Sequence, residues 1–339
     1  MDYLQDWINT NNYIEEFKKH KVQYRKYPDK DLLIIKRKYG LPYSDEFPWL
    51  NYCRGLIINY KTNKIVFIPP IKSKDVLTIE ELQGKGSLEN LVDGTMINLF
   101  NINNEWLVST RYNIGCTNKW TQDINFKEMF DECSKKLDYE SLYKDHTYSF
   151  VMRHSKNKMI SKINKNELVL VEVYQGHQKL SILPKNDNYT LVNEWSPYSL
   201  YKGFTVSNNN IRYKWLTSEQ KFINMIQPNT NNPCLNYITL RNSGFLTSYL
   251  NIFPDMRFEF DKYRKKIYTL TQLLYKYYVN VNIKKQLEKK DIPFVLKPLV
   301  YELHGIFLRD KQGISYQIVT QYIYNLEPTR LQFVINGLK

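Results

Sequence analysis

The chain has 339 residues, 42% of them hydrophobic and 15% aromatic, which excludes an intrinsically disordered protein and allows one large domain with a smaller one. The formal net charge of +14 favours a polyanionic partner, although a generally basic, solvated surface explains it equally well. The four cysteines form no CxxC pair, and neither a secretory signal nor a membrane-spanning apolar run is present. We therefore expect a soluble, intracellular, cytoplasmic protein without a membrane partner, a metal site or a disulfide framework.

Residues 91–115 are predicted to form the central hairpin of the first domain. The first strand opens on Asp93, Gly94 and Thr95, the chain turns at 101–105, and the second strand ends at Arg111. Bulky side chains on both faces of the first strand predict a sheet that is covered on both sides. At the open end of the hairpin, a carboxylate, a glycine and an arginine form a candidate cradle for a phosphate or a ribose.

Further strands and helices are predicted on both sides of this hairpin. Helical spacing of apolar residues predicts helices over 2–19 and between 117 and 143 that pack on the main domain. Residues 77–89 read as a polar connector in which 84–87 only superficially resemble a phosphate-binding loop. The expected strands are 32–35, a hairpin over 54–68, 147–152, 167–174, and a strand pair within 195–215 that turns at 208–210.

From about Thr217 helix signals dominate and predict an all-α domain. Pro254 is expected in the first turn of a long helix, and further helices are expected after Pro293, from Ser315 and from Pro328. Residues 218–339 include 17 basic and 9 acidic residues, a net charge of +8. This domain is a candidate platform for RNA or for a protein partner, although solvated helix faces explain the same charge. The predicted buried stripe of the long helix is Tyr263, Ile267, Leu270, Leu274, Tyr277 and Val281.

A series of short motifs follows in a fixed order across residues 50–215. The motifs are Arg54-Gly55, Leu91-Val92-Asp93-Gly94-Thr95, Ser109-Thr110-Arg111, Tyr148 to Val151 with 157–160 behind it, Leu168 to Tyr174, Lys202 to Val206, and Arg212-Tyr213-Lys214. The series resembles the nucleotidyltransferase domain of covalent RNA ligases and mRNA capping enzymes, most of all phage RNA ligases and the ligase-like proteins of large DNA viruses. The resemblance implies an α+β fold: a nucleotidyltransferase domain with ATP-grasp-like antiparallel sheets over 1–217, then an all-α domain over 218–339.

The departures from this family pattern concern its catalytic residues. Leu91 stands where the family has the lysine that attacks the nucleotide α-phosphate, and Val151 and Lys202 stand at its acidic positions. A cation at an acidic position disfavours Mg²⁺, which binds oxygen ligands. The resemblance therefore implies an inactive protein without metal or cofactor. The residues implied to bind RNA or a nucleotide are Arg54, Asp93, Gly94, Arg111, Lys202 and Lys214, with Arg212 or Leu216 as the partner of Lys214.

The leading hypothesis is a catalytically inactive protein that binds RNA or a nucleotide-bearing RNA end as a subunit of a viral RNA-processing or translation complex. One alternative is an active RNA ligase or guanylyltransferase that uses Lys85 or Lys202 as a relocated nucleophile. Another is an interaction scaffold or virion component that does not bind nucleic acid. Asp93 and Arg111 are about as well explained by an ion pair that holds the hairpin as by ligand binding. His154 is expected to be a solvated surface group.

Overall fold

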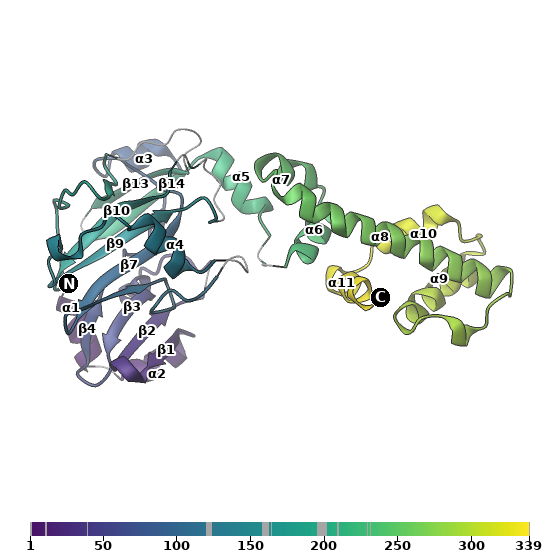
Figure 1. Cartoon of the computed structure of the whole chain (residues 1–339), viewed down its shortest axis with the longest axis horizontal. Coiled ribbons are helices and arrows are strands. Elements are labelled where there is room, and N and C mark those ends of the chain that lie inside the picture. The colour runs from purple at the N-terminus through teal and green to yellow at the C-terminus, as the bar shows by residue number, and fades with distance from the viewer. Residues whose placement is uncertain are drawn as a thin grey trace. The chain divides into compact units, whose positions relative to one another are not determined.

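The computed structural model describes residues 2–10, 12–38, 40–119, 124–157, 163, 165–194, 202–208, 210–228, 230 and 232–338. The chain divides into two compact units, residues 1–221 and 222–339, which are treated separately below. The first unit contains the sheets and the second is helical, so the protein is of the α+β class (Figure 1). Helix α5 (Ser218–Ile226) begins at the predicted domain boundary and crosses the division between the units.

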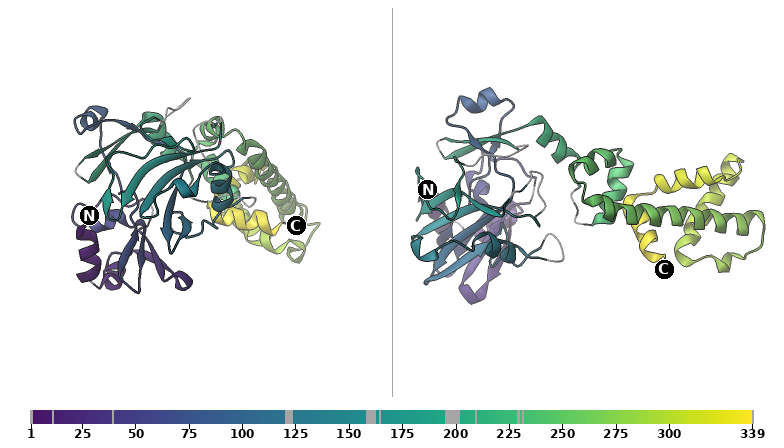
Figure 2. Two further views of the ribbon diagram at one scale, coloured as in Figure 1. Left: turned by 60° about the vertical axis from the view of Figure 1, so that its left-hand side comes forward. Right: turned by 45° about the horizontal axis from the view of Figure 1, so that its top comes forward.

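Three sheets of mainly antiparallel strands build the first unit. The first has the order β1-β2-β3-β4, and the second has the order β11-β10-β9-β7-β8 with β12 paired in parallel to β10. The third has the order β5-β14-β13-β6, in which β5 and β14 are parallel. The second sheet lies between the other two (Figures 1 and 2).

The strand bounds in the first sheet are β1 (Gln23–Tyr27), β2 (Leu32–Lys36), β3 (Arg54–Asn59) and β4 (Lys64–Phe67). The second sheet contains β7 (Thr95–Ile102), β8 (Glu105–Ser109), β9 (His146–Arg153), β10 (Glu167–Gln175), β11 (Gln178–Lys179) and β12 (Thr190–Leu191). The third contains β5 (Lys74–Asp75), β6 (Glu89–Asn90), β13 (Gly203–Asn208) and β14 (Ile211–Leu216). These bounds confirm the strands predicted at 32–35, 54–68, 147–152 and 167–174. In the expected strand pair, residues 195–201 and Asn209 lie outside the described residues.

The predicted central hairpin is confirmed as β7 and β8. Asn103 and Asn104 have φ values of 52° and 65°, the left-handed conformation that two-residue hairpin turns require and that asparagine tolerates. Ile97 and Leu99 of β7 are buried against Phe150, whereas Phe100 packs on the other face against residues of the first sheet. The expectation that β7 is covered on both sides is therefore confirmed.

Short helices cover the sheets of the first unit. Helices α1 (Asp2–Thr10) and α2 (Tyr13–Lys19) bury Leu4, Ile8 and Phe17 against the first sheet. Helix α4 (Phe126–Cys133) packs on the second sheet and begins with a capping box between Asn125 and Glu128. The predicted connector over 77–89 contains one short helix, α3 (Ile79–Gln83), capped by Thr78.

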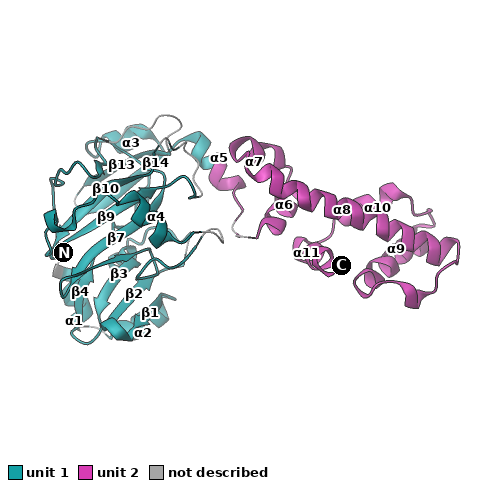
Figure 3. Cartoon of the chain, in the orientation of Figure 1, with its two compact units in different colours: residues 1–221 teal, residues 222–339 magenta. Residues whose placement is uncertain are grey.

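The second unit consists of helices in the residues that the structure describes (Figure 3). Its long helix α8 begins at Met256 and buries Phe260, Ile267, Leu270 and Leu274; Tyr278 is buried where Tyr277 was predicted. A π-helical turn (Val279–Ile283) follows it. The other helices are α6 (Pro233–Asn242), α7 (Leu246–Ile252), α9 (Lys297–Asp310), α10 (Tyr316–Tyr324) and α11 (Pro328–Gly337). No described helix of the chain has the length and the apolar character needed to cross a membrane.

Candidate functional site

A cavity of about 270 Å³ in the first unit brings the predicted site residues together. It is lined by residues of all three sheets and by the segment 69–73 that follows β4. Nine positions of the motif series line it: Arg54, Leu91, Val92, Gly94, Arg111, Val151, Val171, Arg212 and Lys214. Because these residues are separated by up to 160 positions in the sequence, the cavity is a product of the fold rather than of one local motif.

The floor of this cavity is apolar. Val151, Val171 and Val192 are buried together in one cluster, and Val92 and Met96 pack against it. Leu91 lines the same cavity, so the positions at which the ligase family has its lysine and its strand glutamate carry hydrocarbon side chains. None of the residues that line the cavity is acidic, and the described part of the chain contains no cluster of His, Cys, Asp and Glu able to hold a metal ion. The residues present do not fit a divalent cation.

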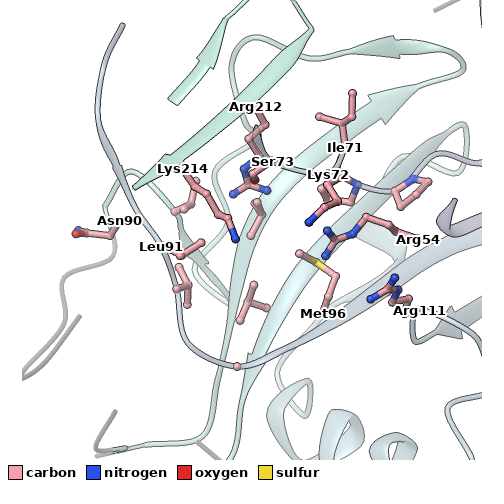
Figure 4. Close-up of a pocket in the computed structure, with 17 residues that line it drawn as sticks. Arg54, Ile71, Lys72, Ser73, Asn90, Leu91, Met96, Arg111, Arg212 and Lys214 are labelled. Carbon is pink, nitrogen blue, oxygen red and sulfur yellow. The ribbon is translucent and has the colours of Figure 1, made fainter. Parts of the chain in front are cut away.

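Five cations surround this floor. Arg54, Lys72 and Arg111 reach it from one side, and Arg212 and Lys214 reach it from β14 on the other (Figure 4). Arg212 and Lys214 share one face of the strand because side chains two residues apart point the same way. Of the two residues considered as the partner of Lys214, Arg212 lines the cavity and Leu216 does not. The side chain of Lys214 also lies 3.1 Å from the carboxylate of Asp75.

Two glycines of the predicted motifs allow the close approaches that shape the cavity. Gly55 has a φ of +113°, and a Cβ on it would lie 3.3 Å from the Cα of Arg111, so the glycine lets Arg54 and Arg111 come together. A Cβ on Gly94 would lie 2.5 Å from the carbonyl oxygen of Met152. The Arg54-Gly55 and Asp93-Gly94 pairs thus have a steric basis in this chain.

Lys72 is a cavity residue that the sequence did not reveal. Its half-buried ammonium is poorly solvated and lies among Arg54, Lys214 and Arg111, and these effects lower its pKa to about 8, although Asp75 partly opposes them. A substantial fraction of Lys72 is therefore uncharged in mildly alkaline solution. Its only signal in the sequence is its position two residues after Pro69-Pro70, which does not by itself indicate a site.

The basic character continues into an adjoining cavity of about 270 Å³. Arg54, Lys72, Arg111 and Lys214 line both cavities, and Arg37 and Lys38 add two further cations against the single carboxylate of Asp75. Arg111 is held in place because its Nη2 donates a 3.1 Å hydrogen bond to the carbonyl of Arg37. The two cavities together make a cation-lined cleft.

Two predicted binding residues, Asp93 and Lys202, are not among the residues that line the cleft. Asp93 is 5% exposed and forms an ion pair with the ammonium of Lys202. Its backbone carbonyl accepts a 3.5 Å hydrogen bond from Arg153. The sequence allowed Asp93 to pair with Arg111; in the structure the carboxylate of Asp93 contacts Lys202, and Arg111 donates to the carbonyl of Arg37. Lys85, the other candidate for a relocated nucleophile, lies 4.5 Å from the ring centre of Tyr213 and also does not line the cleft.

The expectation that His154 is a solvated surface group is wrong. Its side chain is 1% exposed, and its Nε2 lies 2.9 Å from the carboxylate of Glu132. Its Nδ1 accepts a 3.1 Å hydrogen bond from the backbone of Lys156, so both ring nitrogens are engaged in holding the chain after β9. Residues 158–160, the predicted tail of the motif at Tyr148 to Val151, lie outside the described residues.

Comparisons with known proteins give no family. No family model and no curated protein matches the chain. A similar solved structure is the "Putative ATP-dependent DNA ligase from Aquifex aeolicus", with 15% sequence identity, a TM-score of 0.39, and coverage of 80% of this chain and 77% of that chain. At this TM-score the similarity carries no conclusion about activity.

Proposed function

We propose that the chain binds the phosphate of an RNA end or a nucleotide in the cation-lined cleft and does not transfer a nucleotide through residue 91. It would then be an inactive relative of the covalent RNA ligases and capping enzymes. The observation that carries this proposal is the meeting of five cations around one cavity that has an apolar floor and no acidic residue in its lining. An anion with a neutral, partly apolar group attached complements such a surface.

Clustering these cations is costly even with Asp75 beside Lys214, and a phosphate would lower the cost. Burial lowers the pKa of Lys72 most, and the neighbouring Arg54 and Lys214 lower it further. A phosphate offers several acceptor oxygens, and guanidinium groups bind phosphate through paired hydrogen bonds. Occupation by phosphate should therefore stabilise the charged form of Lys72 and release bound counterions.

Chemical transfer requires groups that the cleft does not supply at the expected positions. A lysyl-nucleotide needs an amine that attacks the α-phosphate, and Leu91 has none. Metal assistance needs oxygen ligands, and Val151 and Lys202 replace the two acids expected there. These substitutions support a binding protein, and the resemblance to viral ligase-like proteins supports a place in a viral RNA-processing or translation complex.

The binding proposal is tested with two RNAs of one sequence, one carrying a 5′-phosphate and one a 5′-hydroxyl. Fluorescence anisotropy on the full chain should show the phosphorylated RNA bound about tenfold or more tightly, as expected for charged hydrogen bonds to a terminal phosphate. The affinity should fall steeply with salt, by about 0.7 in log K per log salt for each phosphate contact. Equal affinity for the two RNAs would contradict end binding, and no binding of any RNA at low salt would favour the interaction scaffold.

A second candidate function is supported by Lys72 itself. Lys72 has a pKa lowered to about 8, which leaves part of its amine uncharged, and it lies in the cation-lined cleft, whereas Lys85 and Lys202 do not line the cleft. The test is incubation with radiolabelled ATP or GTP and Mg²⁺ followed by denaturing electrophoresis. We expect no labelled band. A band that disappears in Lys72→Met and persists in Lys202→Met would establish an active enzyme with a relocated nucleophile.

A further inference from the structure

A third cavity, which is polar and is here called the Glu172 cavity, adjoins the first of the two cavities that form the cleft. Its volume is about 410 Å³, and Ile71, Val171 and Arg212 line both spaces. The Glu172 cavity lies between β10, the segment 179–183 and the β13–β14 hairpin, all of which belong to the first unit. Because the two spaces share Arg212, a ligand whose phosphate contacts this arginine has a neighbouring space for the group attached to that phosphate.

A β-bulge places Glu172 in this cavity. Val169 pairs with Val151 and Leu170 with Phe150, but the next pair is Glu172 with Ser149, so Val171 is an extra residue in β10. Strict alternation would direct Glu172 into the core with Leu168 and Leu170. The bulge instead gives Val173 to the core and leaves both Val171 and Glu172 lining the cavities. Bulges next to binding sites commonly re-aim a side chain in this way.

Glu172 retains an unused acceptor although it is buried. Its side chain is 3% exposed, and Oε1 accepts a 2.9 Å hydrogen bond from Lys179. Oε2 lies within normal hydrogen-bond distance of no donor among the described residues, although the hydroxyl of the buried Tyr174, whose pKa is raised by burial and by Glu172, is a neighbouring donor. Nε of Arg212, which is 8% exposed, donates no hydrogen bond to the described residues. Leaving a buried acceptor without a hydrogen bond is unfavourable, and more so when the acceptor is charged. A ligand that donates to Oε2 would remove this cost.

The charged residues that line the Glu172 cavity indicate which kind of ligand group could donate a hydrogen bond to Oε2 of Glu172. Its lining has two carboxylates, Glu89 and Glu172, and two cations, Lys179 and Arg212, so it favours neither a free cation nor an anion. Burial of Glu89 raises its pKa, as does the neighbouring Glu172, whereas Arg212 and Lys179 act in the opposite direction. Ser207 and Asn208 add neutral polar groups. A neutral group with hydrogen-bond donors complements this lining.

We propose, on the basis of the proposed function, that the Glu172 cavity holds the nucleoside of the phosphate-bearing ligand, which donates a hydrogen bond to Oε2 of Glu172 while its phosphate lies against Arg212. A nucleoside carries several hydrogen-bond donors, and the proposal commits to two of them, the ribose 2′-hydroxyl and the N–H groups of guanine. The first would make the site selective for RNA over DNA, and the second would make it selective for guanine.

Titration calorimetry of the full chain with 5′-GMP, 5′-dGMP and 5′-AMP separates the two donors. Loss of a hydrogen bond to a charged group should weaken binding about tenfold or more. We expect this loss for dGMP if the ribose is the donor and for AMP if guanine is. Equal affinities for all three ligands, with binding that still depends on Lys214, would overturn the nucleoside site and leave phosphate binding intact. Absence of binding by all three ligands and by 5′-phosphorylated RNA would overturn the proposed function itself.

The variant Glu172→Gln tests the acceptor directly, and Glu105→Gln is the matched control because Glu105 is an exposed carboxylate paired with Lys30. We expect Glu172→Gln to lower the affinity for GMP about tenfold relative to that for inorganic pyrophosphate, which has no nucleoside. Glu105→Gln should leave this ratio unchanged. An unchanged ratio in Glu172→Gln, in a protein with wild-type thermal unfolding, would overturn the inference; if the variant unfolds, the nucleotide series on the wild-type chain decides.

Discussion

The two units use their basic residues in different ways. In the first unit five cations that lie far apart in the sequence converge on one cavity, whose lining contains no acidic residue. In the helical unit several cations lie on the surface beside acidic residues of the same or a neighbouring helix, as in Lys262 with Glu259 and Arg330 with Glu302. The net charge of +8 over residues 218–339 is therefore distributed over a surface that also carries ion pairs, whereas the charge of the cleft is concentrated around one cavity.

This difference identifies the region in which charge can select a ligand. Surface ion pairs contribute little to stability, and salt screens them, so they constrain a binding partner weakly. Cations gathered in a cavity are partly desolvated and interact more strongly with an anion that enters it. The comparison favours the first unit as the phosphate-binding part, and the helical unit as an RNA or protein platform stays a prediction.

The largest expected effect comes from removing both β14 cations in Arg212→Met/Lys214→Met. Each lost hydrogen bond to a phosphate costs about 1.5–3 kcal/mol, so the Kd for 5′-phosphorylated RNA should rise about a hundredfold or more. Methionine retains most of the buried hydrocarbon, and the carboxylate left by Lys214 belongs to the largely exposed Asp75. Because Arg212 also faces the carboxylates of Glu89 and Glu172, thermal unfolding checks that the variant is folded. Fluorescence anisotropy measures the affinity.

Lys185→Met is the matched control for this pair. Lys185 is an exposed lysine whose ammonium lies 2.6 Å from Glu194, outside the residues that line the cleft. Its loss should change the Kd less than about twofold. Similar losses in the control and in the double variant would show that overall charge, rather than the cavity, binds the RNA.

The glycines of the two units should respond oppositely to alanine. A Cβ on Gly94 would meet the Met152 carbonyl at 2.5 Å, so Gly94→Ala should lower the free energy of unfolding by about 1–3 kcal/mol. Gly305 lies within helix α9 with no neighbouring atom within 4 Å of an added Cβ, so Gly305→Ala should raise it by about 0.5–1 kcal/mol. Urea unfolding measures both. A stabilised Gly94→Ala would show that the β7–β9 packing is looser than described.

Much of the first unit followed from local patterns in the sequence. Asparagines suited to the β7–β8 turn and alternating strands predicted the central hairpin. The order of the motifs selected Arg54, Leu91, Gly94, Arg111, Val151 and Lys214, which line one cavity. The glycines were also informative, because their backbone approaches are fixed by sterics. The hairpin depends on neighbouring residues, which makes it visible in a single sequence, whereas the set of site residues rested on the resemblance to a family.

The missed features depend on residues that are distant in the sequence. The bulge in β10 changes which face Glu172 occupies, and an uninterrupted apolar strand gives no sign of it. The pKa of Lys72 is lowered only because the fold buries it among Arg54, Arg111 and Lys214. Asp93 forms an ion pair with Lys202, which is more than a hundred residues later in the sequence. Pairings of this kind are set by the tertiary fold.

Binding of phosphate should depend on pH through Lys72. With a pKa of about 8, Lys72 is mostly charged at pH 7 and mostly neutral at pH 9, and only the charged form attracts an anion. Above pH 8 binding should therefore take up a proton, and the affinity should fall by up to about tenfold between pH 7 and 9. Calorimetry in two buffers of different ionisation enthalpy measures the proton uptake. Lys72→Met should bind more weakly at pH 7 and lose this pH dependence; a wild-type profile in that variant would assign the titration to another group.

The smallest effect is expected from the helical unit. Lys284 and Lys285 are exposed, and at 0.15 M salt an exposed charge is screened within about 8 Å. Reversing both, in Lys284→Glu/Lys285→Glu, should change the Kd for 5′-phosphorylated RNA less than about threefold, because each solvated cation contributes little to specific binding. A loss of tenfold or more in anisotropy at this salt concentration would show that the helical unit contacts the RNA. The cleft would then bind the terminal phosphate while the helices bind the strand that follows it.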